Sequence, residues 1–359
     1  MLEILKLNIK EDAQKYNLIL NTFELKNPYN LLEYYEIFCG GLNDLICFIY
    51  YCSDKNQIII MPGYIKPVNI MGRIIDNYYD FYTPYGYTGP FFNNNVNKNE
   101  VISFWRNVDE WMKNNNVVSE FIRFNLFGNS IGYSGQLLPT MLNVKGKIID
   151  KETQWINFEH KVRKNVKKAI RENLESKIFY NNIIEKDIKD FYDIYIDTMK
   201  RAQANDSFFF PFEGFLKFIQ NNNFFSAICT IYLNNIPISS ELLLVSDDSI
   251  FSFLGGTKEE YFHLRPNDFL KYEVINWARE KGKKNYVLGG GYGYEDGIFK
   301  YKKSFFPDDV EPFITGRKII DEKNYKFFVE FASKERIKNN MEELKMNDIS
   351  YFPLYKKQN

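Results

Sequence analysis

The order of helices and strands expected in the second half of the chain constrains the fold more than any other feature. Two amphipathic helices precede three consecutive short apolar strands, and a helix and a further strand follow them. The pattern predicts helices over 185–201, 212–222 and 268–281 and strands over 225–233, 236–245, 250–254 and 285–288. The first strand turn, Asn234-Asn235, is typical of a tight hairpin. Strands that follow one another directly, with helices before and after them, predict a mixed sheet rather than a doubly wound parallel one.

The first half of the chain repeats this order of elements. They are expected at 2–7, 11–21, 30–38, 45–51, 57–61, 101–113, 117–126 and 141–149, with a helix over 158–173 opening the second half. A long segment rich in glycine and proline, 62–97, is expected to be irregular. Because 359 residues exceed what one hydrophobic core usually serves, we predict an α/β fold (α+β, mixed sheet) in two domains. They span 1–150 and 151–320, and a helix and tail follow at 321–359.

Charge and cysteine usage exclude several classes of protein. Lysine plus arginine equals aspartate plus glutamate at 46 each, so no net field recruits nucleic acid or an anionic membrane, although a local basic patch still can. The longest apolar stretch, 45–52, is shorter than the ~20 residues of a membrane helix. No signal peptide is recognised, and the four cysteines lack CxxC spacing. We therefore expect a cytoplasmic protein without membrane insertion or a stable protein partner.

Histidine usage limits the chemistry further. Only His160 and His263 are present, which argues against histidine-rich metal sites and against a Ser-His-Asp triad. We therefore expect neither a metal nor a cofactor.

The run LGGGYGYEDGIFKYKKSFF, 288–306, is the most unusual segment of the sequence. Three glycines after a strand allow positive φ and close backbone approach, and either a turn or a ligand loop would use them. No Gly-Lys-Ser/Thr follows and the GxGxxG spacing is missed, which argues against a phosphate loop. On a helix, Lys302 shares a face with Phe299 and Phe305. A lysine held against aromatic rings is suited to pair with an oxyanion or a phosphate.

A carboxylate also lies within an apolar strand. Glu241 occupies the middle of 236–245, where a charged side chain is uncommon unless it is paired. Burial would raise its pKa towards that of a useful general base. An ion pair with Arg201 or Lys302 that only stabilises the fold is an equal alternative.

Two further segments have open interpretations. The helix over 158–173 carries six basic residues, among them Lys161 and Arg163, and is either a solvated face or a clamp for the phosphates of a substrate or a tRNA. The loop DFYTPYGYTGP, 80–90, either lines a cleft through tyrosines such as Tyr85 and Tyr87 or packs as an Ω-loop.

Taken together, these segments resemble the FemAB family, the aminoacyl-transferring branch of the GNAT-like fold. The resemblance covers about 28–320 and rests on motifs that recur in one order: TPYGYTGP, KVRKNVKKAI, YIDTMKR, SFLGGT, RPNDFLKYEVINWA, and LGGG followed by FKYKKSF. It implies two GNAT-like domains in tandem, with donor and acceptor channels in the second. It also implies that the C-terminal helix packs back on the first domain.

The resemblance assigns roles to individual residues. Tyr301 and Lys302 match the family's aromatic-lysine pair, whose lysine supports the oxyanion of the reaction, and Arg201 falls where an arginine holds the phosphates of the acceptor. Asn267 and Tyr292, in the matching segments, are further candidate substrate contacts.

The sequence also departs from the family. Asn125-Leu126 replaces an Asp-Pro of the peptidoglycan-bridge members, the long helical hairpin is absent, and His263–Asn267 replaces the acetyl-CoA loop. These departures bear on the acceptor and on the donor.

We therefore predict a transferase that forms an amide bond on an amine acceptor. The favoured donor is aminoacyl-tRNA and the favoured acceptor a peptidoglycan precursor or a related cell-envelope amine. One alternative is an N-acyltransferase that uses acyl-CoA or an acyl carrier and acts on an amino sugar or a peptide. The other is a catalytically silent binding protein of the same fold.

Overall fold

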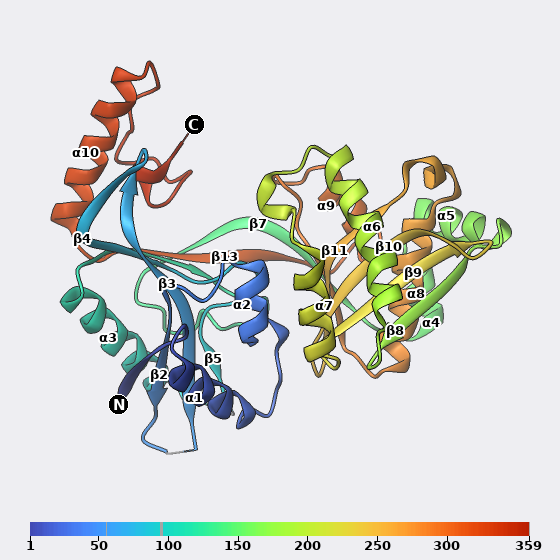
Figure 1. Cartoon of the computed structure of the whole chain (residues 1–359), viewed down its shortest axis with the longest axis horizontal. Helices are drawn as coiled ribbons and strands as arrows, with labels where there is room; N and C mark the ends of the chain where they lie inside the picture. Colours follow the sequence, from blue (N-terminus) through green and yellow to red (C-terminus); the bar gives the residue numbers. More distant parts are fainter. Residues whose placement is uncertain (55, 94–95, 359) are drawn as a thin grey trace. The chain divides into compact units, whose positions relative to one another are not determined.

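The computed structural model describes residues 1–54, 56–93 and 96–358. The chain divides into two compact units (Figure 1). Unit 1 comprises Met1–Glu24, Cys39–Thr140 and Phe313–Asn359, and unit 2 comprises Leu25–Phe38 and Met141–Pro312. The predicted boundary at residue 150 differs from this division, because residues 25–38 of the first half belong to unit 2.

Unit 2 contains a mixed sheet whose strands are hydrogen-bonded in the order β7-β12-β11-β10-β9-β8. Only β11 and β12 run parallel, and the other described pairs are antiparallel. The strands are β7 (Gln136–Lys147), β8 (Glu175–Tyr180), β9 (Ser226–Leu233), β10 (Ile236–Val245), β11 (Ser249–Thr257) and β12 (Asn285–Gly289). The turn Asn234-Asn235 between β9 and β10 has positive φ at both residues, as a tight hairpin requires.

Helices cover both faces of this sheet (Figure 1). They are α2 (Leu32–Phe38), α4 (Lys151–Asn157), α5 (His160–Arg171), α6 (Glu185–Arg201), α7 (Phe212–Asn221), α8 (Pro266–Glu280) and α9 (Gly297–Lys303). On one face α6 approaches β11 so closely that a Cβ at Gly256 would lie 2.2 Å from Thr198 Oγ1. On the other face α8 and α5 pack over apolar side chains of β9 and β10.

Aromatic rings explain why the segment 25–38 joins unit 2. The ring of Phe38 packs edge-on against Phe253 of β11 and Phe218 of α7, with centroid separations of 5.0 and 5.1 Å. Tyr29, in the single turn Pro28–Asn30, contacts Phe251 at 5.1 Å. Such pairs add to the burial of large apolar area, so this early segment is part of the second core.

Unit 1 repeats the topology of unit 2. Its strand order is β1-β2-β3-β4-β6-β13, β5 pairs with β3, and β4 and β6 form the parallel pair. The elements are β1 (Leu2–Lys6), α1 (Lys10–Asn21), β2 (Leu45–Tyr51), β3 (Ile58–Ile70), β4 (Arg73–Tyr82), β5 (Phe91–Phe92), α3 (Lys98–Asn114), β6 (Val117–Arg123), β13 (Val310–Ile319) and α10 (Glu322–Lys338). In each unit a helix connects the parallel strands. The mixed-sheet fold class predicted from the sequence is confirmed.

The segment 62–97 is not irregular as predicted: most of it is a long hairpin formed by β3 and β4, with residues 94–95 outside the described part of the chain. Pro62 lies in β3 in register with Cys47. A Cβ at Gly63 would lie 2.1 Å from the ring of Phe81, so this glycine makes room for a core side chain. The proline and the glycine are therefore accommodated within the strand. The hairpin turns at Met71-Gly72, where both φ angles are positive.

The C-terminal segment is part of unit 1. Helix α10 contributes Tyr325 and Phe328 to a cluster that includes Val68 and Val118. Beyond the helix, Lys356 pairs with the buried Asp80 at 2.6 Å.

A buried carboxyl group in unit 1 makes stability depend on pH. Glu120 is fully buried on β6; Tyr133 donates to its Oε1 at 2.7 Å, and its Oε2 has no hydrogen-bond partner among the described residues. Burial raises the pKa of Glu120 to about 7, against opposing effects of Lys318 and the Tyr133 hydrogen bond, while Asp109 adds to the rise. The folded state therefore favours the protonated acid.

We predict that the unfolding free energy falls as pH rises from about 4.5 through 7. A carboxyl group with a raised folded-state pKa contributes fully below its unfolded pKa, and the contribution disappears above its folded pKa. The change is on the order of 3 kcal/mol. Glu120→Gln imitates the protonated acid, so wild type and variant should be equally stable at about pH 4 in urea unfolding, and the variant more stable at about pH 8.5. Parallel pH profiles of the two proteins would contradict the assignment.

Candidate active site

The candidate site in unit 2 begins with the glycine-rich turn between β12 and α9. Asp296 caps α9: its Oδ1 accepts from the Phe299 N–H at 2.8 Å, and its Oδ2 from the Tyr292 and Gly293 N–H groups at 2.7 and 3.1 Å. These bonds lower the pKa of Asp296, that from Phe299 most. A Cβ at Gly291 would lie 1.9 Å from Asp296 Oδ1. The glycines therefore let the turn close around its own carboxylate, which favours the turn interpretation over a ligand loop.

Lys302 of α9 is held in an apolar environment. Its Nζ donates to the Gly290 carbonyl at 2.6 Å, and Phe299, Phe305 and Phe306 of the same segment are buried. Burial, and then the charge of Lys271, lower the pKa of Lys302 to about 8. At pH 7 the side chain is therefore mainly cationic, in surroundings where one positive charge acts strongly.

Tyr301 and Asn267 meet beside Lys302. The Asn267 amide donates to the Tyr301 hydroxyl at 2.9 Å, and the ring of Tyr301 packs edge-on against Phe305 at 5.4 Å. Burial raises the pKa of Tyr301 well above its usual value. Asn267 is the second residue of α8 and does not occupy its N-cap position. That position belongs to Arg265, with φ +64°, because Pro266 already occupies the first helical position.

Glu241 of β10 forms a buried ion pair, but its partner is neither Arg201 nor Lys302. Lys271 of α8 approaches its Oε1 at 2.5 Å, and both side chains are almost inaccessible. Ser252 of β11 also donates to Oε1, and Tyr286 of β12 donates to Oε2 at 2.8 Å. Lys271 Nζ further donates to Ser252 and Tyr286 at 3.0 and 3.2 Å. Both carboxylate oxygens are thus occupied. A general-base role for Glu241 stays a prediction. The ion pair disfavours that role, because both carboxylate oxygens already have partners.

This polar network lies where β11 and β12 stop pairing. The parallel register runs from Ser249–Asn285 to Phe251–Val287, and the register of β11 with β10 shifts at the next residues. A bulge re-aims side chains and ends pairing, and bulges are frequent beside active sites. Ser252 and Tyr286 flank this point, so Lys271 and Glu241 fix the positions at which the strands diverge.

Sequence reasoning missed Lys271, Ser252 and Tyr286. A signal was present for Lys271: it lies seven residues before Ala278 and three before Val274 on the apolar stripe of α8, where a charged side chain has to be paired. No local pattern distinguishes Ser252 or Tyr286, whose contacts form between strands.

The N-terminus of α8 is occupied by its own residues. Pro266 lacks an N–H group, and the Arg265 N–H donates to the Phe262 carbonyl. Asp268 is buried there, accepts from the Asn165 amide at 3.0 Å, and has its pKa raised by burial. A carboxyl group at this end competes with a phosphate for the positive end of the helix dipole.

The remaining predicted site residues are distributed over the chain. Arg201 lies at the end of α6 with its guanidinium 4.9 Å from the ring of Phe262. Arg163 donates to the carbonyls of Ile156 (2.7 Å) and Phe158, and therefore secures the end of α4. Tyr292 is exposed.

Lys161 and the two tyrosines of the loop 80–90 complete the set. Lys161 is exposed on α5, and its charge lowers the pKa of Asp268, against the larger effect of burial. Tyr85, exposed, and Tyr87, packed at 5.8 Å against Phe313, belong to unit 1. Their contribution to a substrate site stays a prediction.

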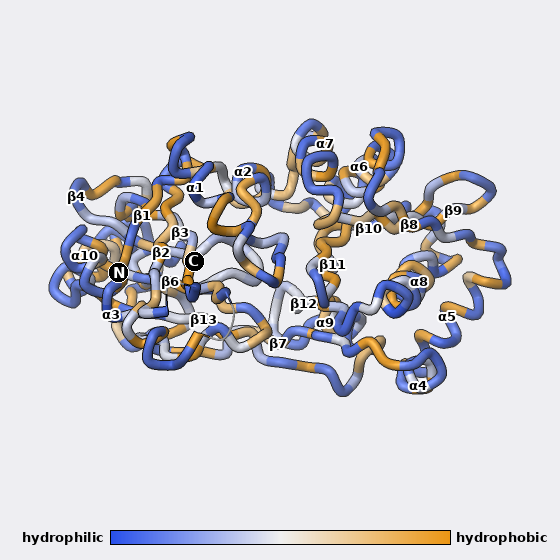
Figure 2. The backbone as a smooth tube through the Cα atoms, turned by 90° about the horizontal axis from the view of Figure 1, so that it is seen from below, coloured by the Kyte–Doolittle hydropathy of each residue, from blue (hydrophilic) through white to orange (hydrophobic). Residues whose placement is uncertain are grey.

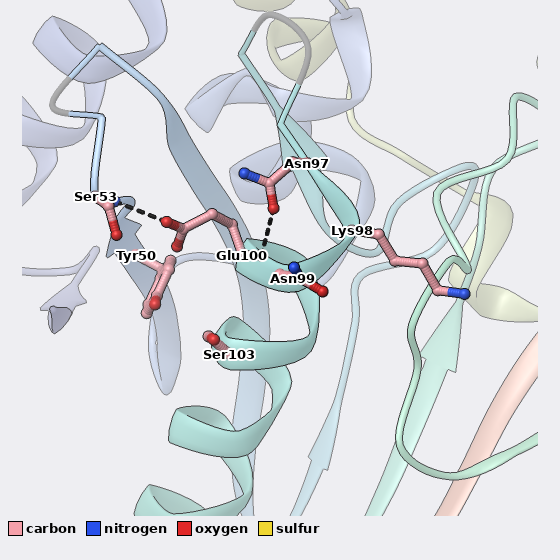
Figure 3. A pocket seen from close by; sticks show the side chains of 7 residues that line it. All are labelled: Tyr50, Ser53, Asn97, Lys98, Asn99, Glu100 and Ser103. Carbon is pink, nitrogen blue, oxygen red and sulfur yellow. Dashed lines mark hydrogen bonds between the residues drawn. The ribbon is translucent and has the colours of Figure 1, made fainter.

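A pocket of about 330 Å³ in unit 1 has a different character (Figure 3). It surrounds the first turn of α3, where Asn97 caps the Glu100 N–H at 3.0 Å and Glu100 Oε1 accepts from the Ser53 N–H at 2.9 Å. Hydrogen bonds to Ser53 lower the pKa of Glu100. The first turn of α3 is thus hydrogen-bonded to the residues that precede it and to Ser53.

Neither a metal cluster nor a membrane helix is found within 1–54, 56–93 and 96–358. No three His, Cys, Asp or Glu side chains gather to hold an ion there. No helix in that part of the chain is long and apolar enough to cross a bilayer.

Comparisons with known proteins bear on the class of the protein. Residues 160–303 match the family described as acetyltransferase (GNAT) domain. Aminoacyltransferase FemA of Staphylococcus epidermidis is 30% identical over 84 residues, 22% of this chain and 20% of that protein. A lipid II:glycine glycyltransferase of Staphylococcus haemolyticus (strain JCSC1435) is 28% identical over 74 residues, 21% of this chain and 18% of that protein. This chain thus covers only about a fifth of the length of these relatives.

A solved structure matches over nearly the whole chain. The crystal structure of FemX superimposes with a TM-score of 0.59 at 13% identity, covering 90% of this chain and 99% of that one. The fold and the matched segment define a protein of the GNAT-like acyltransferase class. The matched segments of FemA and of the lipid II:glycine glycyltransferase support the FemAB resemblance predicted from the sequence motifs, and FemX shares the fold.

The buried pair makes a stability prediction. Removing one partner of a buried ion pair leaves an uncompensated charge and typically costs about 3–5 kcal/mol. Lys271→Met should therefore lower the unfolding free energy by that order in urea denaturation. The double variant Lys271→Met/Glu241→Gln should recover part of the loss, because no charge then remains unpaired.

Glu241→Gln alone separates the two roles considered for this carboxylate. Reduced turnover at unchanged stability would support the general base. A large loss of stability with normal turnover of the folded fraction would make Glu241 structural. A Lys271→Met variant as stable as wild type would contradict the ion pair.

Proposed function

We propose that this protein transfers an aminoacyl group from aminoacyl-tRNA to the amine of a peptidoglycan precursor or a related cell-envelope molecule. The observation that carries the proposal is Lys302, a mainly cationic lysine held among buried aromatic rings. It lies in the segment that matches the GNAT domain and the family's aromatic-lysine pair. The names of the similar proteins, an aminoacyltransferase and a glycyltransferase that acts on lipid II, support the class of donor and acceptor.

The reaction needs few protein groups. A neutral amine attacks the ester carbonyl and forms the C–N bond, and the carbonyl oxygen becomes an oxyanion beside the Lys302 ammonium group. Collapse of this intermediate breaks the C–O bond, and the proton lost by the amine balances the leaving hydroxyl group. Tyr301, fixed by Asn267, is proposed to shape the site around the carbonyl. No covalent enzyme intermediate is required.

The α8 terminus supports an aminoacyl-tRNA donor over acyl-CoA. A CoA pyrophosphate is usually bound by free N–H groups in a glycine-containing loop at a helix N-terminus. Here Pro266 has no N–H, Arg265 uses its own, and Asp268 brings a carboxyl group to the same end. Lys161 and Arg201 are proposed as phosphate contacts instead.

The second candidate is an acyl-CoA or acyl-carrier-dependent N-acyltransferase. The description of the matched domain as an acetyltransferase favours this candidate. The divergence of β11 and β12 favours it too, because β11 continues past the end of its pairing with β12 and its backbone N–H and C=O groups there lie outside that pairing. Lys302 would serve the same purpose with a thioester donor. A silent binding protein would retain the fold without using Lys302 at all.

Lys302→Met should abolish most catalysis. Loss of one oxyanion donor typically costs on the order of 100- to 1000-fold in rate, while methionine preserves length and apolar packing. Single-turnover transfer from aminoacyl-tRNA to a peptidoglycan precursor measures the effect. In wild type the rate should decline above about pH 8 as the ammonium group loses its proton.

Lys300 is the matched control for this variant. It is exposed on the same helix, so Lys300→Met should remain near wild-type activity. Equal losses from Lys300→Met and Lys302→Met would indicate a general basic surface, and normal turnover in Lys302→Met would reject the site.

The donor assignment is tested by binding. Phosphate contacts release counterions, so aminoacyl-tRNA should bind with an affinity that falls steeply between 50 and 200 mM salt, by on the order of 10-fold or more. Acetyl-CoA should show no binding in the same titrations. Micromolar acetyl-CoA binding together with salt-insensitive or absent tRNA binding would favour the second candidate.

A further inference from the structure

The outer face of α5 is strongly basic and carries no acidic side chain. Between His160 and Arg171 the helix has six lysines and arginines and no aspartate or glutamate. Six side chains share one face and line a hollow of about 690 Å³: His160, Arg163, Lys164, Lys167, Ile170 and Arg171. The chain as a whole is neutral, so this face is a local concentration of charge. Since local fields decide contacts within a Debye length, it attracts polyanions despite the neutral total.

The opposite face of α5 fixes the helix to unit 2. Val162, Val166 and Ala169 are buried in the same core as Leu270 and Val274 of α8. Arg163 bonds to the end of α4, and Lys167 lies 6.0 Å from the ring of Trp155. The α4–α5 pair is therefore a rigid platform that presents its outer side chains without rearrangement.

Aliphatic side chains project from this basic surface. Ile170 on the face itself is 51% exposed, and Ile156 of α4, whose carbonyl accepts the Arg163 hydrogen bond, is 69% exposed. In Figure 2 the tubes of α4 and α5 are largely blue with short orange segments. An RNA backbone offers phosphates but no apolar partner for an isoleucine. A lipid surface offers both, anionic headgroups at the outside and acyl chains just beneath them.

We propose that the outer face of α4–α5, defined by Ile156, Lys164, Lys167, Ile170 and Arg171, docks the protein on anionic phospholipid membranes. Lysine and arginine ammonium and guanidinium groups pair with headgroup phosphates, and the two isoleucines enter the headgroup–acyl boundary. The contact is peripheral, because the inner face of α5 remains in the core. The purpose of this docking rests on the proposed function, since a lipid-borne acceptor would be reached at that surface. The docking itself does not depend on that function.

Sedimentation with vesicles tests the proposal. Phosphatidylcholine vesicles with ~30% phosphatidylglycerol are compared with vesicles of pure phosphatidylcholine, at low and high salt. Wild type should bind the anionic vesicles and not the neutral ones. The triple variant Lys164→Gln/Lys167→Gln/Arg171→Gln should bind on the order of 100-fold more weakly, at several-fold per basic residue. Ile156→Ser/Ile170→Ser should remove the binding that persists at high salt.

A charge-matched control comes from unit 1. Lys323, Lys326 and Lys334 are exposed on α10, and changing all three to glutamine alters the net charge equally. This variant should bind within a few-fold of wild type. Equal losses from the α5 and α10 triple variants, or no preference for anionic vesicles, would overturn the proposal.

A parallel titration with tRNA separates the two polyanions. If the α5 triple variant loses tRNA but keeps the vesicles, the face is an RNA surface and the membrane proposal is wrong. Lys302→Met should bind vesicles like wild type. Normal vesicle binding combined with normal turnover in Lys302→Met would reject the proposed function alone.

Discussion

The ion pair between Glu241 and Lys271, together with its two hydroxyl partners, joins three strands and one helix of unit 2. Glu241 is on β10, Lys271 on α8, and their hydroxyl partners Ser252 and Tyr286 are on β11 and β12. Two buried charges tolerate little displacement, because each would otherwise lose its partner charge in a medium of low dielectric. The pair therefore sets the spacing of three strands and one helix at the point where the parallel register ends.

The same pair shapes the electrostatics around Lys302. Burial lowers the pKa of that lysine most, Lys271 lowers it further, and Glu241 and Asp296 raise it. Because the pair is neutral overall, its two effects on Lys302 oppose each other, and burial dominates. The resulting pKa of about 8 leaves the ammonium group mainly charged at pH 7. A cation that is desolvated but not neutralised is the form an oxyanion requires.

Sequence patterns predicted the elements of unit 2 well, because its strands and helices follow local hydrophobic periodicity. Strand β10 and helix α6 have the predicted bounds. The hairpin of β3 and β4 was missed because Pro62, Gly63 and Pro67 act as local breakers only where no neighbouring strand compensates for them, and the ring of Phe81 explains Gly63. The part-buried setting of Lys302 was predictable from its aromatic neighbours, and its catalytic role stays a prediction. The partner of Glu241 was not predictable, since it is thirty residues away and meets it only when α8 packs on the sheet.

The two faces of helix α5 have different roles: one packs in the core and the other is exposed and basic. Its buried side contributes valine and alanine to the core. Its outer side concentrates positive charge, which the zero net charge of the whole chain does not indicate. Cationic side chains on a rigid helix lose less conformational freedom on binding a surface than the same residues on a loop. The exposed isoleucines would add little to such a helix in water alone and gain energy only when an apolar phase covers them. A face that combines both kinds of residue is therefore better explained by an interface between water and hydrocarbon than by solvent.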